Sequence, residues 1–301
     1  MALGFYGLKP TDTSVTLDVG IVIKSYTTKA KIMKKAKIRP PFKIHGGKWY
    51  LHSWIIEHFP KDYENMIYVE PFCGAASTFM NKNPSVEEAI NDLDKGVVNL
   101  LRIIRDQPDE FIGKLKKLKY SKEAFELAVD LQDKSKDEEM AYAINEFTLR
   151  RMSRGGLKKA FAWSNRERGG QPGDVNAWDT IISMIPTISE RLRTTYIFNK
   201  PALQILNAFN EKNVLAYVDP PYLHETRQSV SVYKHEMTAD EHIDLANFLK
   251  GFKGKVILSG YPSPLYNRLY KPWKCIKKKV ANHASQQKTK EQKTECLWIN
   301  Y

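Results

Sequence analysis

The sequence contains few cysteines and no long apolar run. Its 301 residues include three cysteines, Cys73, Cys275 and Cys296. Their odd number argues against a disulfide framework and their spacing against paired zinc ligands. We therefore expect no metal site and a reducing, cytoplasmic setting. No stretch reaches the ~20 apolar residues that a membrane helix needs, and the first residues show no signal-peptide pattern. The sequence thus predicts a protein that does not enter a membrane.

Acidic residues are scarce relative to basic ones. The chain has 47 Lys and Arg against 34 Asp and Glu, which gives a formal net charge of +13. Apolar residues make up 42% of the chain, enough for a sizeable core. A basic surplus of this size favours a polyanionic partner, most often nucleic acid. A protein that is basic without such a partner, or one that binds an anionic membrane, is the alternative.

Strand-forming runs alternate with segments of helical periodicity. Apolar residues recur at helical spacing from Leu51 to Phe59 and from Val97 to Ile104. Strands are predicted at 66–69, at the start of 86–94, and at 194–199, 214–218, 255–260 and 296–301. Such alternation predicts an α/β fold with a largely parallel sheet.

The chain divides into segments of different composition. Residues 1–38 form an N-terminal extension to which we assign no role, although "TLDVGIVIKSY" within it has strand character. Residues 39–107 and 179–301 carry the α/β pattern. Between them, residues 108–178 alternate acidic and basic helical stretches and end in a loop rich in Gly and Arg. We interpret 108–178 as an inserted, mainly helical domain.

Two turns follow the first two strands of the α/β pattern. The first, "EPFCGAAS", begins at Glu70, and its small residues from Gly74 allow a ligand to approach the backbone. The second contains Asp92 and Asp94, and an acid in this place commonly binds ribose hydroxyls. A plain strand-to-helix turn and a helix N-cap are the respective alternatives. In open α/β sheets ligands bind beyond the carboxyl ends of strands, so the pair favours a shared site.

A third turn, "VDPPY", ends the strand at 214–218. Proline fixes the backbone and cannot donate to a sheet, so the strand stops abruptly there. The turn presents the Asp219 carboxylate, a free carbonyl and the ring of Tyr222. Two acceptors and a ring can hold a planar amino group, with the ring stacked on the heterocycle. A stiff turn without a function is the alternative.

At this point the residues resemble a known family. "PFKIHGGK", "VEPFCGAAS", "INDLD" and "VDPPY" occur in the order found in Dam-like N6-adenine-specific DNA methyltransferases, particularly phage and prophage members. The resemblance covers residues 40–301. It implies a Rossmann-like, S-adenosylmethionine-dependent sheet with an inserted target-recognition domain, in a bacterial or phage-infected cell. It also implies that S-adenosylmethionine is the cofactor and S-adenosylhomocysteine the product.

The resemblance assigns residues to each part of the reaction. The cofactor-binding residues it implies are Lys43, Gly46, Gly47, Lys48, Glu70, Pro71, Phe72, Cys73, Gly74, Ala75, Ala76, Asp92, Asn199 and Asp219. The catalytic tetrapeptide is Asp219, Pro220, Pro221 and Tyr222. Family members often carry an acid near "FNKPAL" that meets the cofactor's adenine, and Asn199 is the polar candidate there.

The implied reaction transfers a methyl group to N6 of an adenine flipped out of double-stranded DNA. Extrusion of the base costs a few kcal/mol, and stacking on Tyr222 returns roughly 1–3 kcal/mol. Cytosine N4 methylation more often carries Ser at the position of Asp219, and RNA or protein methylation Asn. A catalytically silent DNA-binding partner is a further alternative, although none of the tetrapeptide residues is lost. We expect a monomer, because one flipped base needs one site.

Basic residues cluster toward the end of the insertion. The predicted DNA-binding residues are Arg150, Arg151, Arg154, Lys158, Lys159, Arg166 and Arg168. Phosphate and groove contacts are the functional interpretation, and a solvated charged loop is the alternative. A second run, Lys277–279, could add backbone contacts.

Overall fold

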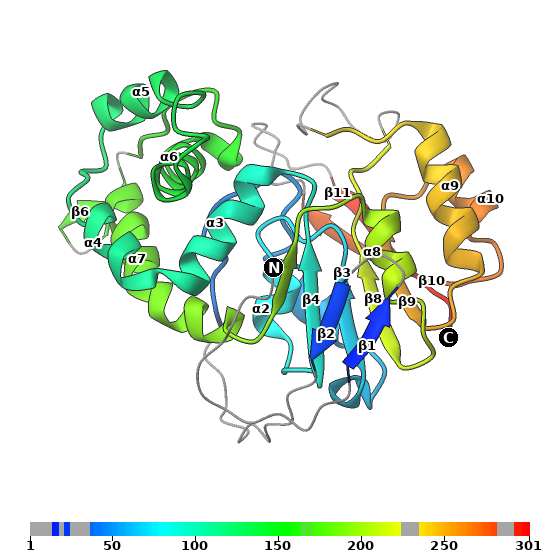
Figure 1. Cartoon of the computed structure of the whole chain (residues 1–301). Coiled ribbons are helices and arrows are strands. Elements are labelled where there is room, and N and C mark those ends of the chain that lie inside the picture. The colour runs from blue at the N-terminus through cyan, green and yellow to red at the C-terminus, as the bar shows by residue number, and fades with distance from the viewer. Residues whose placement is uncertain are drawn as a thin grey trace.

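The computed structural model describes residues 14–17, 21–24, 37–164, 166–168, 170–223, 235–281 and 292–301. Its centre is a seven-stranded sheet in the order β10-β11-β9-β8-β3-β4-β7 (Figure 1). The strands β3 (Ile67–Glu70), β4 (Glu87–Asn91), β7 (Tyr196–Phe198), β8 (Val214–Val218) and β9 (Lys255–Gly260) run parallel. The strands β11 (Gln292–Ile299) and β10 (Lys274–Ala281) continue the sheet antiparallel. The α/β, Rossmann-like fold expected from the sequence is confirmed.

The predicted strands all occur, and two have the expected ends. Strands β8 and β9 match 214–218 and 255–260 residue for residue, because buried apolar runs flanked by polar turns mark both. Strand β11 begins at Gln292, earlier than expected, and β10 was not predicted. Four of the eight residues of β10 are lysines, so its sequence resembles a solvated charge run. An edge strand tolerates such a composition, because charged side chains there discourage pairing with another chain.

Helices pack on both sides of the sheet (Figure 1). The short helices are α1 (His52–Ile56), α2 (Ser77–Asn81), α8 (Ala202–Ala208) and α10 (Pro264–Leu269), with η1 at Tyr63–Asn65 and η2 at Arg154–Gly156. The longer ones are α3 (Lys95–Asp106), α4 (Pro108–Leu115), α5 (Lys122–Asp130), α6 (Glu139–Arg151), α7 (Gly173–Leu192) and α9 (Ala239–Lys250). In the chain, α3 to α7 all lie between β4 and β7.

Helices α4 to α7 gather beside α3 at one side of the molecule (Figure 1). Two paired strands of two residues each precede α7, namely β5 (Glu167–Arg168) and β6 (Gln171–Pro172). The expected boundary at residue 178 falls inside α7. The assignment of 108–178 to target recognition stays a prediction. In the N-terminal extension, β1 (Ser14–Leu17) pairs antiparallel with β2 (Ile21–Lys24), while most of residues 1–38 lies outside the described residues.

Alternate residues of the central strands face two separate apolar clusters. Tyr68 and Tyr217 point into the cluster formed with α1, α3, α6 and α7, whereas Val69 and Ala216 point into the cluster formed with α8 and α9. This alternation follows from the period of two along a strand. All four side chains are at most 1% exposed. Burial on both faces makes the sheet a rigid platform for the turns at its carboxyl edge.

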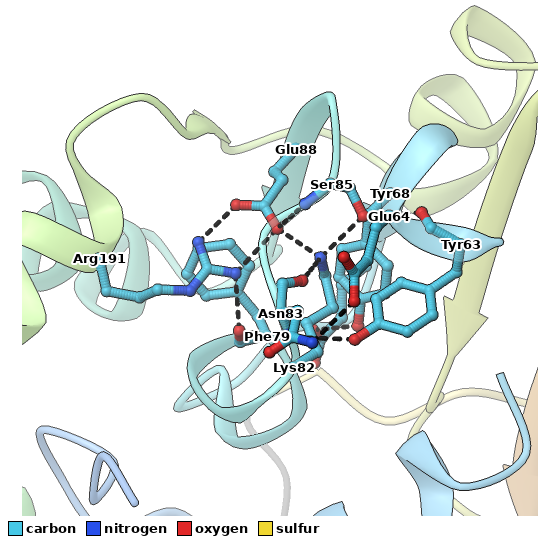
Figure 2. Close-up of polar contacts among 10 residues, drawn as sticks. Tyr63, Glu64, Tyr68, Phe79, Lys82, Asn83, Ser85, Glu88 and Arg191 are labelled. Atoms are coloured by element: carbon cyan, nitrogen blue, oxygen red, sulfur yellow. Dashed lines mark hydrogen bonds and ion pairs between the residues drawn. The ribbon is translucent and has the colours of Figure 1, made fainter. Parts of the chain in front are cut away.

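A cluster of buried charged residues lies near the amino end of β4 (Figure 2). Glu88 accepts hydrogen bonds from Lys82 at the end of α2 and from both terminal nitrogens of Arg191 on α7. Lys82 is 0% exposed and its Nζ lies 4.3 Å from the ring centroid of Tyr68. Burial alone would raise the pKa of Glu88, but Lys82 and Arg191 together lower it to about 2. The cluster of Lys82, Glu88 and Arg191, here the sealed cluster, ties α2 and α7 to the sheet.

Candidate active site

The turns after β3 and β4 are joined by hydrogen bonds. The amide of Cys73 donates to the carbonyl of Asn91 over 2.8 Å, and the Asn91 side chain donates to the Pro71 carbonyl over 2.9 Å. The amide of Gly74 donates to the Asp92 carboxylate over 2.8 Å. Gly74 and Ala76 have φ values of 49° and 53°, in the left-handed region. The two turns that the sequence paired are therefore one continuous surface.

A cleft of about 530 Å³ opens at this edge of the sheet. Its volume falls in the range of small-molecule sites, about 300–1,000 Å³. The cleft-lining residues that the sequence predicted are Gly46, Gly47, Lys48, Glu70, Phe72, Cys73, Gly74, Ala75, Asp92, Asp219, Pro220, Pro221, Arg150, Lys158 and Lys159. The structure thus brings the Gly-Gly-Lys element and all three turns to one cavity.

Asp92 and Asp94 have different positions in the second turn. Asp94 is the N-cap of α3, because its side chain accepts a hydrogen bond from the amide of Gly96 over 3.0 Å. Asp92 accepts from the amides of Gly74 and Asp94, both over 2.8 Å, and lies in the cleft wall. Burial raises the pKa of Asp92, and its two backbone hydrogen bonds offset part of that shift. Both acids line the cleft, but only Asp94 also caps α3.

Glu70 is a buried carboxyl group in the cleft wall. It is 3% exposed, and the hydroxyl of Tyr68 donates to it over 2.8 Å. Burial raises the pKa of Glu70 to about 8, because a carboxylate loses its hydration there. Such a group favours a cationic ligand, since a nearby positive charge restores the ionised form. S-adenosylmethionine carries a sulfonium and an ammonium group, so the Glu70 carboxyl group fits this ligand.

Asp219 lies at the carboxyl end of β8 and holds two neighbours. Its Oδ2 is 3.0 Å from Nζ of Lys48, and its Oδ1 accepts from the hydroxyl of Ser259 over 2.7 Å. Ser259 in turn lies 3.1 Å from the hydroxyl of Tyr217. Lys48 also donates to the carbonyl of Gly46 over 2.8 Å. The carboxylate is therefore fixed by two strands and by the Gly-Gly-Lys element.

Tyr222, the last residue of the predicted tetrapeptide, is not among the cleft-lining residues, and the ammonium of Lys48 lies over its ring. Tyr222 is 5% exposed, and Nζ of Lys48 lies 4.5 Å from its ring centroid. Its hydroxyl donates to Glu295 on β11 over 2.9 Å, and the ring of Tyr261 meets it edge-on at 4.6 Å. The ammonium of Lys48 thus contacts both Asp219 and the ring of Tyr222, the two groups that the sequence assigned to binding an adenine.

Four predicted cofactor residues lie outside the cleft wall. These are Lys43, Pro71, Ala76 and Asn199. The side-chain amide of Asn199 donates to the carbonyls of Asp92 and Leu93 over 2.9 and 3.1 Å, so it braces the second turn. The backbone carbonyl of Lys43 packs against Gly156 so closely that a Cβ there would lie 2.0 Å from it. Both residues therefore support the cleft from outside.

Arg150 belongs to a buried ionic cluster and not to a DNA-facing surface. It is 3% exposed, and it pairs with Asp94 over 2.7 Å and with Glu146 over 2.8 Å. Lys158 completes this group, here the cleft cluster, through a 2.8 Å contact with Glu146. Arg150 borders the cleft, but its Nε and Nη2 are already paired with the carboxylates of Glu146 and Asp94, so little of the guanidinium is left for a DNA phosphate. The prediction that Arg150 contacts DNA therefore does not fit the structure.

The other predicted DNA-binding residues differ in exposure. Arg154, Lys159 and Arg166 are exposed, whereas Arg151 is half-buried and donates to the carbonyl of Ala177 over 2.9 Å. Burial lowers the pKa of Arg151 to about 10. The Arg168 side chain lies outside the described residues. Among the described side chains, fewer of the predicted DNA-binding cations are exposed than the sequence suggested.

Several cleft-lining residues were not predicted. They are Ile44, His45, Ser77, Thr78, Leu93, Gln132, Lys136, Tyr142, Glu146, Gly156, Leu157, Tyr217, His235, Glu236, Met237 and Glu241. Asp94, which the sequence placed in the second turn, lines the cleft as well. One signal was available for Glu146, which precedes Arg150 by four positions on α6 and so faces it. Most of the others come from segments far apart in the chain.

Two further observations concern metals and membranes. In the part of the chain that the structure describes, no group of three His, Cys, Asp or Glu side chains could hold a metal ion. Within that same part, no helix is both long and apolar enough to cross a bilayer.

Cys73 is buried, and burial raises the pKa of its thiol well above the ordinary value. It therefore has the character of a small turn residue.

The chain is similar to several known methyltransferases. The chain is 26% identical over 288 residues to the Type II methyltransferase M1.LlaDCHI of Lactococcus lactis subsp. cremoris, which covers 89% of this chain and 97% of that protein. Two solved structures of the rRNA methyltransferase aviRa from Streptomyces viridochromogenes are also similar. One has a TM-score of 0.39, 9% identity and coverage of 92% of this chain and 96% of that chain. The other has a TM-score of 0.37, 10% identity and coverage of 87% and 86%.

The family comparison covers most of the chain. The pattern of the D12 class N6 adenine-specific DNA methyltransferases matches residues 45–284. That span begins at the Gly-Gly-Lys element, contains all three turns and ends beyond β10. The reaction expected from the sequence, adenine methylation of DNA with S-adenosylmethionine as cofactor, is confirmed by this match. The chain belongs to the D12 class N6 adenine-specific DNA methyltransferase family.

Proposed function

We propose that the cleft divides the reaction between two sets of side chains. Glu70 and Asp92, after β3 and β4, hold S-adenosylmethionine, and Asp219 with its following prolines, after β8, holds an adenine flipped out of double-stranded DNA. The observation that carries this proposal is the single cleft of about 530 Å³ that all three turns line. Adjacent parallel strands bring their carboxyl ends together, so methyl donor and acceptor can meet there.

The cofactor half is built from carboxylates. When bound, S-adenosylmethionine supplies an electrophilic methyl group on a sulfonium. Glu70 offers a carboxylate whose pKa of about 8 leaves it ready to ionise beside a positive ligand. The two oxygens of Asp92 accept hydrogen bonds from the amides of Gly74 and Asp94, and the residue lines the cleft, where ribose hydroxyls can donate to the remaining lone pairs. We extend this role to Gly46, Gly47 and the small residues of the first turn, which let the ligand approach the backbone.

The adenine half acts on one nitrogen atom. The lone pair of adenine N6 is delocalised into the ring, so the amine is a poor nucleophile. Asp219 and the Pro220 carbonyl accept hydrogen bonds from its two N–H groups. These bonds favour a pyramidal nitrogen and stabilise the positive charge that develops as the N–C bond forms. With S-adenosylmethionine bound, N6 would attack the methyl carbon in line, the electron pair of the carbon–sulfur bond would leave with S-adenosylhomocysteine, and the nitrogen would release one proton to solvent. Positioning supplies most of the remaining acceleration.

Lys48 has to withdraw before an adenine can bind in this way. Its ammonium lies 3.0 Å from Asp219 and 4.5 Å from the centroid of the Tyr222 ring. An adenine whose amino group meets Asp219 and whose ring stacks on Tyr222 needs the same space. Entry of the base therefore exchanges one Asp219 partner for another, which reduces the cost of desolvating the carboxylate.

We also propose that exposed cations of the insertion contact the DNA backbone. Arg154, Lys159 and Arg166 lie in the loop that follows α6, and Lys159 borders the cleft. Phosphate contacts of this kind position the duplex without selecting a sequence. We further propose that the protein acts as a monomer in the cytoplasm, and that it belongs with the phage and prophage members that its motifs resemble.

Two matched variants test the division of the cleft. Glu70→Gln removes the carboxylate from the cofactor half, and Asp219→Asn removes it from the adenine half, with little change in shape. We expect Glu70→Gln to weaken S-adenosylmethionine binding in equilibrium dialysis, and Asp219→Asn to retain both cofactor and DNA binding while methyl transfer falls by about 10² or more. Equal loss of cofactor binding in both variants would contradict the proposal.

A further inference from the structure

We propose that Glu295 is a positioning residue that fixes the ring of Tyr222 beside Asp219. The inference rests on the proposed function of this ring as the platform for the flipped adenine. Glu295 lies on β11, far in the chain from every motif that identified the site. Through its hydrogen bond to the phenol it sets where the ring stands, and so affects methyl transfer without contacting the substrate.

The register of the sheet brings Glu295 to the active-site edge. Strand β11 runs antiparallel to β9, and Cys296 pairs with Gly260, the last residue of β9. Glu295 is one residue earlier in β11, so it lies just beyond the carboxyl end of β9. The turn that contains Asp219 and Tyr222 lies at the same edge, after the neighbouring β8. The antiparallel end of the sheet therefore contributes a side chain to a site built by parallel strands.

The contacts around the phenol define the orientation of the ring. Oε2 of Glu295 accepts from the Tyr222 hydroxyl over 2.9 Å, and the two residues are 2% and 5% exposed. Tyr261 packs edge-on at an interplanar angle of 76°. The Tyr222 ring is thus held at its hydroxyl end by Glu295 and at its side by Tyr261, with one face toward Lys48. Loss of the acceptor would free the ring to turn or shift within its pocket.

Packing alone does not account for a carboxyl group at this place. Leu297 and Ile299 are the next residues on the same face of β11, and both belong to the apolar core. A leucine at 295 would continue that apolar row without the cost of burying a carboxylate. Burial raises the pKa of Glu295, and the nearby charges of Lys48, Asp219 and Lys293 act on it as well. The gains that offset this cost are the attraction of Lys48 and the hydrogen bond that Tyr222 donates.

The experiment measures methyl transfer and cofactor affinity separately. Tyr222→Phe removes the donor and keeps the ring, Glu295→Leu removes the acceptor, and Glu295→Gln keeps an acceptor of the same length. We expect the first two to lower the transfer rate at saturating S-adenosylmethionine and unmethylated DNA by about tenfold. Cofactor affinity should be unchanged, Glu295→Gln should recover most of the rate, and Tyr222→Phe combined with Glu295→Leu should be no slower than either alone.

Thr294→Val is the matched control, because Thr294 is the neighbouring residue of β11 and the change keeps its shape. It should transfer at the wild-type rate. A wild-type rate for Tyr222→Phe would overturn the inference even if Glu295→Leu failed to fold. So would a Glu295→Gln variant as slow as folded Glu295→Leu, or losses that multiply in the double variant. Because each rate is compared with that of the wild type, a wild type that methylates no DNA would refute the proposed function instead.

Discussion

The two ends of β4 carry buried ionic clusters with opposite surroundings. Near its amino end, the sealed cluster surrounds Glu88 with Lys82 and Arg191 and encloses all three (Figure 2). Beyond its carboxyl end, the cleft cluster joins Asp94 and Glu146 to Arg150 and Lys158, and all four border the cavity. The chemistry is alike, but one cluster is closed and the other is open to a ligand.

The difference separates a structural role from a functional one. In the sealed cluster the two cations hold the pKa of Glu88 at about 2, so their attraction outweighs the cost of burying the carboxylate. In the cleft, beside the cleft cluster, burial raises the pKa values of Glu70 and Asp92. Those two carboxyl groups carry a desolvation cost that a bound cation or hydrogen-bond donor can relieve. We therefore expect the stability of the protein to depend on the cluster at the amino end of β4, and ligand binding to depend on the groups at its carboxyl end.

The largest effect is expected from breaking the sealed cluster. Glu88→Ala leaves two buried cations without their carboxylate, which destabilises by about 3–5 kcal/mol. Urea unfolding measures the change, and Glu87→Ala, at the adjacent and half-buried position, should alter stability by less than about 1 kcal/mol. The folded fraction of Glu88→Ala should bind S-adenosylmethionine like the wild type. A loss of affinity without a loss of stability would reverse the assignment of the two clusters.

The second prediction concerns the pH dependence of Glu70. Its pKa is raised in the folded state from 4.5 to about 8, so the folded protein favours the protonated form. Stability from this group is lost as the pH rises from about 5 to 8. Glu70→Gln should therefore become more stable than the wild type across that window. In the wild type, cofactor affinity should fall by up to about tenfold for each pH unit below 8 if binding requires the carboxylate. Affinity that is flat from pH 6 to 8 would contradict this.

The third prediction concerns Arg150 in the cleft cluster. Arg150→Met removes one of two cations and leaves Lys158 with Glu146, so the expected loss of stability is smaller, about 1–3 kcal/mol. Because Arg150 is 3% exposed and paired with Asp94 and Glu146, the slope of log K for DNA binding against log salt should not change. A slope reduced by about 1 would show a phosphate contact and would restore the role that the sequence suggested.

The smallest effect on stability is expected at the surface. Arg154→Ala should leave unfolding within about 0.5 kcal/mol of the wild type but reduce the salt slope of DNA binding by about 1. Glu190→Ala on α7, also exposed, is the control and should change neither quantity. Together, Arg150→Met and Arg154→Ala separate a buried arginine from an exposed one. An unchanged slope in both would remove this loop from the DNA interface.

The sequence predicted those parts of the site that depend on local rules. The strand before Asp219 and the turn after it follow from apolar periodicity and proline geometry, and the structure has both at the expected residues. Arg150 was assigned to DNA because its partner Asp94 is 56 positions away in the chain, and only the tertiary fold brings the two together. Glu295 was missed for the same reason, since it lies 73 positions from Tyr222. Strand β10 was missed because an exposed edge strand needs no apolar pattern.

The central claim is that Asp219 holds an adenine whose N6 receives the methyl group. The measurement that tests it most directly is transfer from labelled S-adenosylmethionine to unmethylated DNA, followed by digestion and nucleoside analysis. We expect all label in N6-methyladenine with the wild type and none with Asp219→Ala, which should still bind the cofactor. Label in a cytosine nucleoside, or label in N6-methyladenine that persists in Asp219→Ala, would contradict the account.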